Sequence, residues 1–244
     1  MPNGFRVAWG CASGDGRMRL DVYPTDAEAF EAAAILAADH LRNLPADRPP
    51  AVALSGGRAG RGVMVALAAR SDLPWARIDW WLAEEAAVSV DDARSTMRVA
   101  RDSLFVPRGI APARVHALDE ASAPPALDLV LLGIGPDGRI AGLVPGCRAL
   151  SATGPVARVA ADEYPETDAV GGLTLTPAAL RAARWVIVVG AGDALAHAIA
   201  AALREPVDPR RLPAQLLRPA ESVRWIVDRA AAAELLREAR PAET

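Results

Sequence analysis

Residues 127–146, LDLVLLGIGPDGRIAGLVPG, contain the pattern that decides the fold class of this chain. The stretch begins with a nearly continuous apolar run, which is typical of a central parallel strand covered on both faces. Gly133, Gly135 and Gly138 follow, and glycines let the backbone turn tightly and expose its amides at a helix N-terminus. Such a turn binds anions. The stretch therefore predicts a buried strand, an anion-binding turn and the start of a helix.

Short apolar segments alternate with helical patterns on both sides of this stretch. Thr25 followed by Glu28 predicts a capping box at a helix start, and this helix ends before Pro45. Strands are expected at 17–22, 51–54, 78–82, 127–132, 173–175, 185–189 and 223–227, with a hairpin partner at 5–9. Further helices are expected at 63–69, 93–104, 177–183 and 193–203, and a last one through Arg237. This alternation predicts a mainly parallel, doubly wound sheet in a three-layer α/β/α fold.

Length and apolar content favour one domain. A chain of 244 residues with 52% hydrophobic residues can bury one substantial core. We expect that domain at 17–240, with 1–16 as an N-terminal extension. No apolar run approaches the ~20 residues of a membrane span, and the N-terminus lacks a signal-type pattern. The expected location is therefore the cytoplasm.

Charge and composition exclude several classes of function. A net charge of -3 with interspersed signs favours neither nucleic acid nor an anionic membrane as a partner. All 27 basic residues are arginine, so no lysine is available for a Schiff base or a pyridoxal-phosphate anchor. Cys11 and Cys147 are too few for a disulfide framework and have no metal-type spacing. We therefore expect neither a metal nor a cofactor.

The glycine-rich stretch closely resembles the signature of the 6-phosphogluconolactonase family, within the glucosamine-6-phosphate isomerase superfamily, which usually reads Gly-x-Gly-x-Asp-Gly-His-Thr-Ala. The segments 54–57, 95–100, 173–177 and 213–219 resemble other segments of that family. The resemblance implies a 6-phosphogluconolactonase-like fold and hydrolysis of a phosphosugar lactone in the pentose phosphate pathway. It also implies a small anionic sugar-like ligand, and we expect a monomer or homodimer.

Several positions depart from the family pattern. Arg139 stands at the position of the family's histidine, the implied general base, and Ile140 stands at that of its threonine. A guanidinium stays protonated, so it can bind an anion but cannot accept a proton. Ala83 and Glu85 replace an Asp and an Arg at the end of the third strand, and Gly172 replaces an arginine that holds phosphate. The resemblance therefore implies a weak or altered activity.

Four residues are the catalytic candidates: Glu84, Glu85, Asp137 and Arg139. Adjacent residues of a strand point to opposite faces, so only one of Glu84 and Glu85 can face the cleft as a base, and the other is a helix cap or rim charge. We expect Asp137 to fix the conformation of its loop through hydrogen bonds between its side chain and the backbone. Arg139 is expected to meet an oxyanion together with the loop amides.

The binding candidates come from two turns that follow strands. They are Ser55, Gly56, Gly57, Arg58, Arg61, Gly135 and Gly138. Ligands of open parallel sheets lie outside the strand C-ends where the strand order reverses, and we expect the two turns to meet there. Arg58, Arg61 and Arg139 are expected to project into this one crevice and attract an anion. The alternative is that these arginines are solvated loop charges.

Three functions remain open. The first is a hydrolase for a phosphosugar lactone or a related anionic substrate. The second is an inactive protein that binds a sugar phosphate, and the third is an enzyme repurposed for a non-phosphorylated substrate in a biosynthetic pathway. His40, His116 and His197 fall in segments where packing or surface roles are more typical than catalysis.

Overall fold

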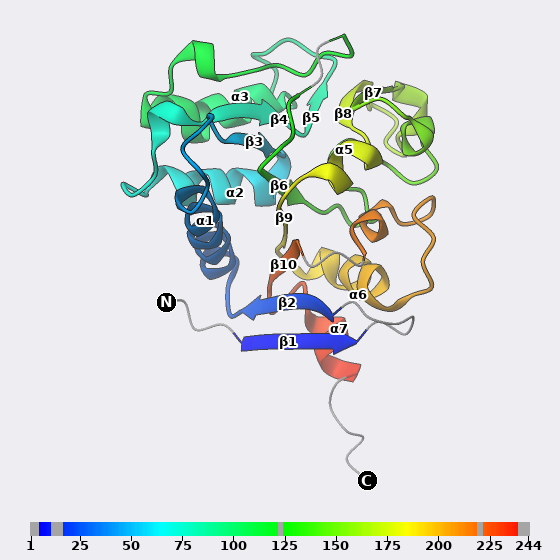
Figure 1. Cartoon of the computed structure of the whole chain (residues 1–244). Coiled ribbons are helices and arrows are strands. Elements are labelled where there is room, and N and C mark those ends of the chain that lie inside the picture. Colours follow the sequence, from blue (N-terminus) through cyan, green and yellow to red (C-terminus); the bar gives the residue numbers. More distant parts are fainter. Residues whose placement is uncertain (1–4, 11–16, 122–123, 219–221, 239–244) are drawn as a thin grey trace.

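The computed structural model describes residues 5–10, 17–121, 124–218 and 222–238 (Figure 1). Its main sheet has the strand order β1-β2-β10-β9-β6-β3-β4, and every neighbouring pair is parallel except β1 with β2. The bounds are β1 (Phe5–Gly10), β2 (Arg17–Tyr23), β3 (Ala51–Leu54), β4 (Asp79–Leu82), β6 (Leu129–Gly133), β9 (Val186–Gly190) and β10 (Val223–Asp228).

A second, antiparallel sheet was not expected from the sequence. It has the order β5-β8-β7, with β5 (Glu84–Ala86), β8 (Gly172–Leu175) and β7 (Val156–Val159). Strand β5 pairs Glu84 with Thr174, so two segments far apart in the chain meet directly after β4. These strands are too short to leave an alternating pattern, which explains why only part of β8 was predicted.

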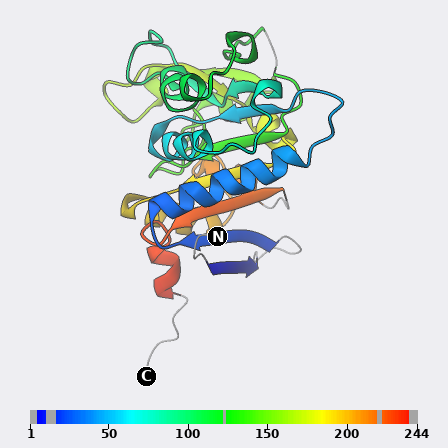
Figure 2. The ribbon, with the colours of Figure 1, turned by 90° about the vertical axis from the view of Figure 1, so that its left-hand side faces the viewer.

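Helices cover both faces of the main sheet, which confirms the three-layer α/β/α fold with a mainly parallel sheet. Helices α1 (Asp26–Arg42) and α2 (Gly57–Ala68) lie on one face, and Figure 2 shows α1 crossing in front of the sheet. Helices α5 (Pro177–Ala182) and α6 (Ala196–Arg204) lie on the other face (Figure 1). The remaining helices are α3 (Thr96–Ala100), which continues through a π-helical turn into α4 (Val106–Arg108), and α7 (Ala233–Glu238).

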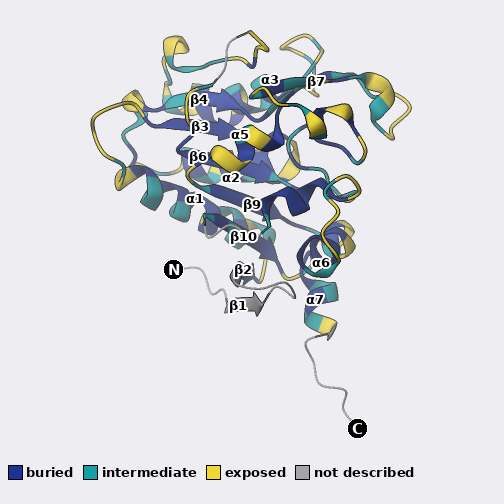
Figure 3. Cartoon of the chain, turned by 45° about the vertical axis from the view of Figure 1, so that its right-hand side comes forward, coloured by how far each residue is buried: buried dark blue, intermediate teal, exposed yellow. Residues whose placement is uncertain are grey.

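The core lies between these layers. Every residue of β3 and β9 is buried, and Figure 3 shows the central strands in the colour of buried residues. The capping box that the sequence predicts at Thr25 and Glu28 is present at the start of α1. Gly62 of α2 lies against the ring of Phe30, since a Cβ there would come within 2.3 Å of it. The two helices therefore pack at close range.

The helix expected after the glycine-rich turn is absent. Residues 134–147 form turns and isolated bridges, and the next helical turn begins at Arg148. Contacts from a distant segment hold this stretch: Gly146 N donates to Arg210 O at 2.7 Å, and Ala214 N donates to Gly138 O at 2.9 Å. The expectation of a helix N-terminus at Gly135–Gly138 was therefore wrong. The turn closes on itself, because Gly135 N donates to Arg139 O and Gly138 N donates to Gly135 O, and the distant segment binds the stretch that follows.

Helix α2 begins earlier than predicted. It starts at Gly57 rather than near residue 63, with Gly56 as its N-cap. Arg58 and Arg61 therefore lie on the first turns of a helix and not on a glycine-rich loop. Position 60 of this helix requires glycine, because a Cβ there would lie 1.9 Å from the carbonyl oxygen of Ser55. Gly60 therefore marks a close approach between α2 and the backbone that follows β3.

Candidate functional site

The main pocket lies at the carboxyl ends of β3 and β6. These strands are neighbours, and the chain leaves β3 toward β4 on one side and leaves β6 toward β9 on the other. This is the reversal of strand order at which ligands of such sheets bind. A pocket of about 390 Å³ is lined there by Ser55–Ala59, Gly133–Pro136 and the turn after β9 at Ala191, Ala194 and Leu195. The expected meeting of the two glycine-rich turns is confirmed.

Glu84 is the acidic residue in the lining of this pocket. Its Oε1 accepts hydrogen bonds from the Ser55 hydroxyl at 3.0 Å and from the Gly56 amide at 2.6 Å. Its Oε2 is buried and has no hydrogen-bond partner among the described residues. The bonds from Gly56 and Ser55 use one oxygen, so the second keeps its lone pairs free. It has no exposed surface, so a molecule in the pocket reaches it only after a local movement of the side chain or the pocket wall.

Burial controls the charge of Glu84. Desolvation raises the pKa of its carboxyl group to about 7, the hydrogen bonds from Gly56 and Ser55 oppose this rise, and the charge of Glu85 adds to it. The carboxyl group therefore exchanges its proton near neutral pH, which is the range that suits a general acid or base.

Glu85 points the other way, as the strand alternation predicts. Its two carboxylate oxygens accept from the backbone amides of Thr96 at 3.0 Å and Met97 at 2.7 Å, at the start of α3. Of the two roles left open for the pair, Glu85 thus has that of a helix cap. Its carbonyl also explains Gly172, where a Cβ would lie 2.3 Å from Glu85 O, so this backbone has no room for a side chain there.

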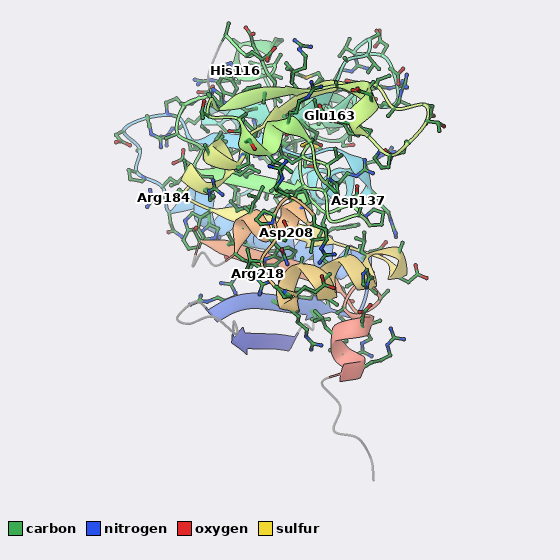
Figure 4. All side chains as sticks on the ribbon, turned by 90° about the vertical axis from the view of Figure 1, so that its right-hand side faces the viewer. His116, Asp137, Glu163, Arg184, Asp208 and Arg218 are labelled. Atoms are coloured by element: carbon green, nitrogen blue, oxygen red, sulfur yellow. The ribbon has the colours of Figure 1, made fainter. Side chains whose placement is uncertain are left out.

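Arg139 lines the pocket and is held by two carboxylates. Its Nε donates to both oxygens of Asp137 at 2.9 and 3.0 Å, and its Nη2 donates to Glu166. Asp137 also accepts from the Arg139 amide at 3.1 Å, which agrees with the loop-fixing role expected for it. Figure 4 shows Asp137 between the segment of Glu163 and that of Asp208. The guanidinium is therefore preorganised, but its charge is already countered.

The three arginines do not share one crevice. Arg58 lines the main pocket, donates to Asp26 at 2.7 Å and approaches the Ala191 carbonyl at 3.5 Å. Arg61 is absent from this lining and lies in a neighbouring pocket between α1 and α2. One turn of helix separates the side chains of Arg58 and Arg61 along α2. The expected common crevice therefore contains Arg58 and Arg139 but not Arg61.

The remaining binding candidates shape the backbone. Gly56 would clash with Thr96 if it carried a Cβ, and Gly57 has a φ of +69° at the start of α2. Gly135 lines the pocket and leaves room for the side chain of Arg139. Gly138 has a φ of +78° and lies against Leu212, outside the lining. The Gly56 amide already donates to Glu84, so it is not free to bind an anion.

Sequence reasoning missed two parts of the site. Glu166 contacts Arg139 from an irregular segment 27 residues later in the chain, and no motif marks it. The turn after β9 was not assigned to the site. Its position directly after a buried strand was the signal that could have identified it.

Other chemistries find little support among the described residues. No group of three or more His, Cys, Asp or Glu side chains there is arranged to hold a metal ion. His40 stacks on Trp185, His116 stacks on Trp81, and the side chain of His197 is 75% exposed. None of the three lines the main pocket. No helix in the described ranges is long and apolar enough to cross a membrane.

Comparisons with known proteins agree with this fold. The family described as glucosamine-6-phosphate isomerases/6-phosphogluconolactonase matches residues 24–126 and 120–225. A 6-phosphogluconolactonase of Streptomyces coelicolor is 31% identical over 224 residues, covering 78% of this chain and 84% of the relative. One of Synechocystis sp. is 30% identical over 207 residues, covering 75% and 84%. The solved structure of the Trypanosoma brucei enzyme has a TM-score of 0.76 at 20% identity, over 91% of this chain and 100% of that one.

Proposed function

This chain belongs to the glucosamine-6-phosphate isomerases/6-phosphogluconolactonase family, and from that premise we propose that its pocket hydrolyses the lactone of an anionic sugar-like substrate. The observation that carries the proposal is the carboxyl group of Glu84 in the wall of the pocket. Burial raises the pKa of this group to about 7. The two relatives, 30% and 31% identical, are 6-phosphogluconolactonases, so a phosphosugar lactone is the first substrate to test.

In the proposed reaction Glu84 is the general base. Its Oε1 is held by Ser55 and Gly56. Its unpartnered Oε2, once a local movement exposes it to the pocket, takes a proton from water as the water oxygen bonds to the lactone carbonyl carbon. The oxyanion that forms is stabilised by the guanidinium of Arg139. The loop amides expected to assist it do not take part, because those of Gly135, Gly138 and Arg139 already donate hydrogen bonds within the turn. When the ester C–O bond breaks, protonated Glu84 returns the proton to the leaving alkoxide, which gives a hydroxy acid.

The reaction is expected to be slow with 6-phosphogluconolactone. Arg139 cannot accept a proton, and the loss of a general base typically costs about 10²–10⁴-fold in rate. Glu84 replaces that base only in part, because its unpartnered Oε2 has no exposed surface and reaches the attacking water only after a local movement. Arg139→His alone is not expected to restore a full rate, since Ala83, Glu85 and Gly172 still differ from the family pattern.

The test is a pH profile of lactone hydrolysis. For 6-phosphogluconolactone, kcat/KM should rise as the pH increases through about 7, because the base acts only when ionised. Glu84→Gln keeps an acceptor for Ser55 and Gly56 but cannot take a proton, so it should lower kcat/KM by about 10²–10⁴-fold and flatten the profile. Glu120→Gln, an exposed carboxylate paired with Arg158, is the control and should leave both unchanged. A Glu84→Gln enzyme with full activity would exclude Glu84 as the base.

Binding without turnover is the second candidate. The two carboxylates on Arg139 favour it, because they counter the charge that would otherwise stabilise an oxyanion. Calorimetry that detects binding of 6-phosphogluconate, together with no hydrolysis above the spontaneous rate, would establish this candidate. Faster hydrolysis of unphosphorylated gluconolactone than of its 6-phosphate would instead establish a repurposed enzyme.

A further inference from the structure

A second pocket lies beside the first, on the outer side of α2. It has a volume of about 850 Å³ and lies between α1, α2 and the segment that leads into α3. Gly57 and Arg58 line both pockets, so the two adjoin at the start of α2. The proposed lactone chemistry makes no use of this second pocket.

The walls of the second pocket are apolar. Phe30 of α1 and Val65 and Val99 of the other two segments line it. Val65 is 54% exposed, and it is one of four large hydrophobic side chains with high exposure in the described ranges. The ring of Phe30 packs on Gly62, so it forms a fixed wall against the backbone of α2. An exposed apolar surface of this kind favours a ligand with an apolar body.

The rim of the same pocket is cationic. Arg58, Arg61 and Arg94 line it, and no Asp or Glu is in its described lining. Arg58 is paired with Asp26 and Arg94 with Asp92, but Arg61 has no ion-pair or hydrogen-bond partner among the described residues. One uncompensated guanidinium therefore stands over an apolar wall, and it favours one negative charge on the ligand.

We propose that this pocket is a second binding site, for a small anion with an aromatic or branched aliphatic body. Arg61 pairs with the carboxylate or phosphate of the ligand, and Phe30 and Val65 contact its apolar part. Arg58 separates this site from the main pocket, because its guanidinium is held by Asp26 on one side and lies beside Ala191 on the other. The proposal is independent of whether the main pocket turns over a lactone.

The test uses three probes at low ionic strength without substrate. 2-Naphthoate has both an apolar body and a charge, 2-naphthol has the body without the charge at neutral pH, and inorganic phosphate has charge alone. Titration calorimetry should show that 2-naphthoate binds at least about tenfold more tightly than either of the others, because only it satisfies both the wall and Arg61. Salt should weaken the binding of 2-naphthoate.

Three variants locate the probe. Arg61→Ala should weaken the binding of 2-naphthoate about fivefold, which is the contribution expected of one partly exposed ion pair. Val65→Asp should weaken it at least as much, because it places a negative charge on the apolar wall. Arg181→Ala removes an exposed arginine of α5, far from the pocket, and should change nothing. Equal affinity for the three probes would overturn the proposal, as would binding that Arg61→Ala and Val65→Asp leave intact or that Arg181→Ala weakens as much.

Discussion

Two opposing effects act on Glu84, and their balance decides its chemistry. Hydrogen bonds from Gly56 and Ser55 favour the ionised carboxylate, while burial disfavours it more strongly, so the pKa rises from 4.5 to about 7. The folded protein therefore binds a proton here that the unfolded chain has released between these two pH values. Stability from this group is complete below about pH 4.5 and is lost as the pH rises toward 7.

Glu84→Gln should remove this pH dependence. Between pH 5 and pH 8 the free energy of unfolding of the unmodified protein should fall relative to that of Glu84→Gln by about 2–3 kcal/mol, from 1.36 kcal/mol per pKa unit. Urea unfolding at four pH values measures both. The slope is the informative quantity, because the new amide also changes the absolute stability. Parallel curves for the two proteins would contradict a raised pKa for Glu84.

Glu166 competes with any anion for Arg139. It is an internal carboxylate on the guanidinium that lines the main pocket, so an anionic ligand has to share or displace it. Glu166→Gln should therefore strengthen the binding of 6-phosphogluconate about three- to tenfold, measured by calorimetry. Glu120→Gln is a matched control, because its side chain is 47% exposed against 46% for Glu166 and is also paired with an arginine. Unchanged affinity in Glu166→Gln would show that Arg139 does not meet the ligand.

At the scale of elements, Glu85 connects β5 to α3. Its two oxygens satisfy the amides of Thr96 and Met97, which have no partner within the helix. Glu85→Ala should lower the free energy of unfolding by about 1–2 kcal/mol, and Glu85→Gln, which keeps one acceptor, should lower it less. Urea unfolding at pH 7 measures the difference. A stability of Glu85→Ala equal to that of the unmodified protein would mean that water replaces the cap without cost.

The elements that sequence patterns predicted are those stabilised by local interactions. The box of Thr25 and Glu28 starts α1, and the apolar runs of β3, β6 and β9 became buried strands. What could not be predicted depends on distant partners. The glycine pattern suggested a helix after Gly138 that does not form. This stretch instead makes hydrogen bonds to residues 210–214, which no local pattern reveals. Strands β5 and β7 exist only through pairing with β8.

At the scale of the whole molecule, strand order explains how much of the site was foreseeable. The reversal between β3 and β6 brings Ser55 and Gly56 to Gly135, and a general rule for parallel sheets predicts that meeting. The direction of each side chain does not follow from topology. Where α2 begins determines that Arg61 faces the second pocket, and an irregular segment without a motif brings Glu166 to Arg139.

The division into an extension, 1–16, and a domain, 17–240, remains a prediction, and the strand order suggests how to test it. Strand β1 pairs with β2 at the end of the sheet, and β2, β10 and β9 lie between it and the site strands β6 and β3. A chain that begins at Arg17 keeps six parallel strands and helix α1 over β2, β9 and β10.

This shortened chain should unfold cooperatively and bind 6-phosphogluconate within about twofold of the full chain, because no residue of the main pocket is removed. It should also self-associate more, since an uncovered β2 presents the unpaired amides and carbonyls of an edge strand. Circular dichroism, calorimetry and analytical ultracentrifugation measure the three properties. A shortened chain that loses cooperative unfolding would place residues 1–16 inside the domain, because the six parallel strands would then be insufficient to sustain the core without β1.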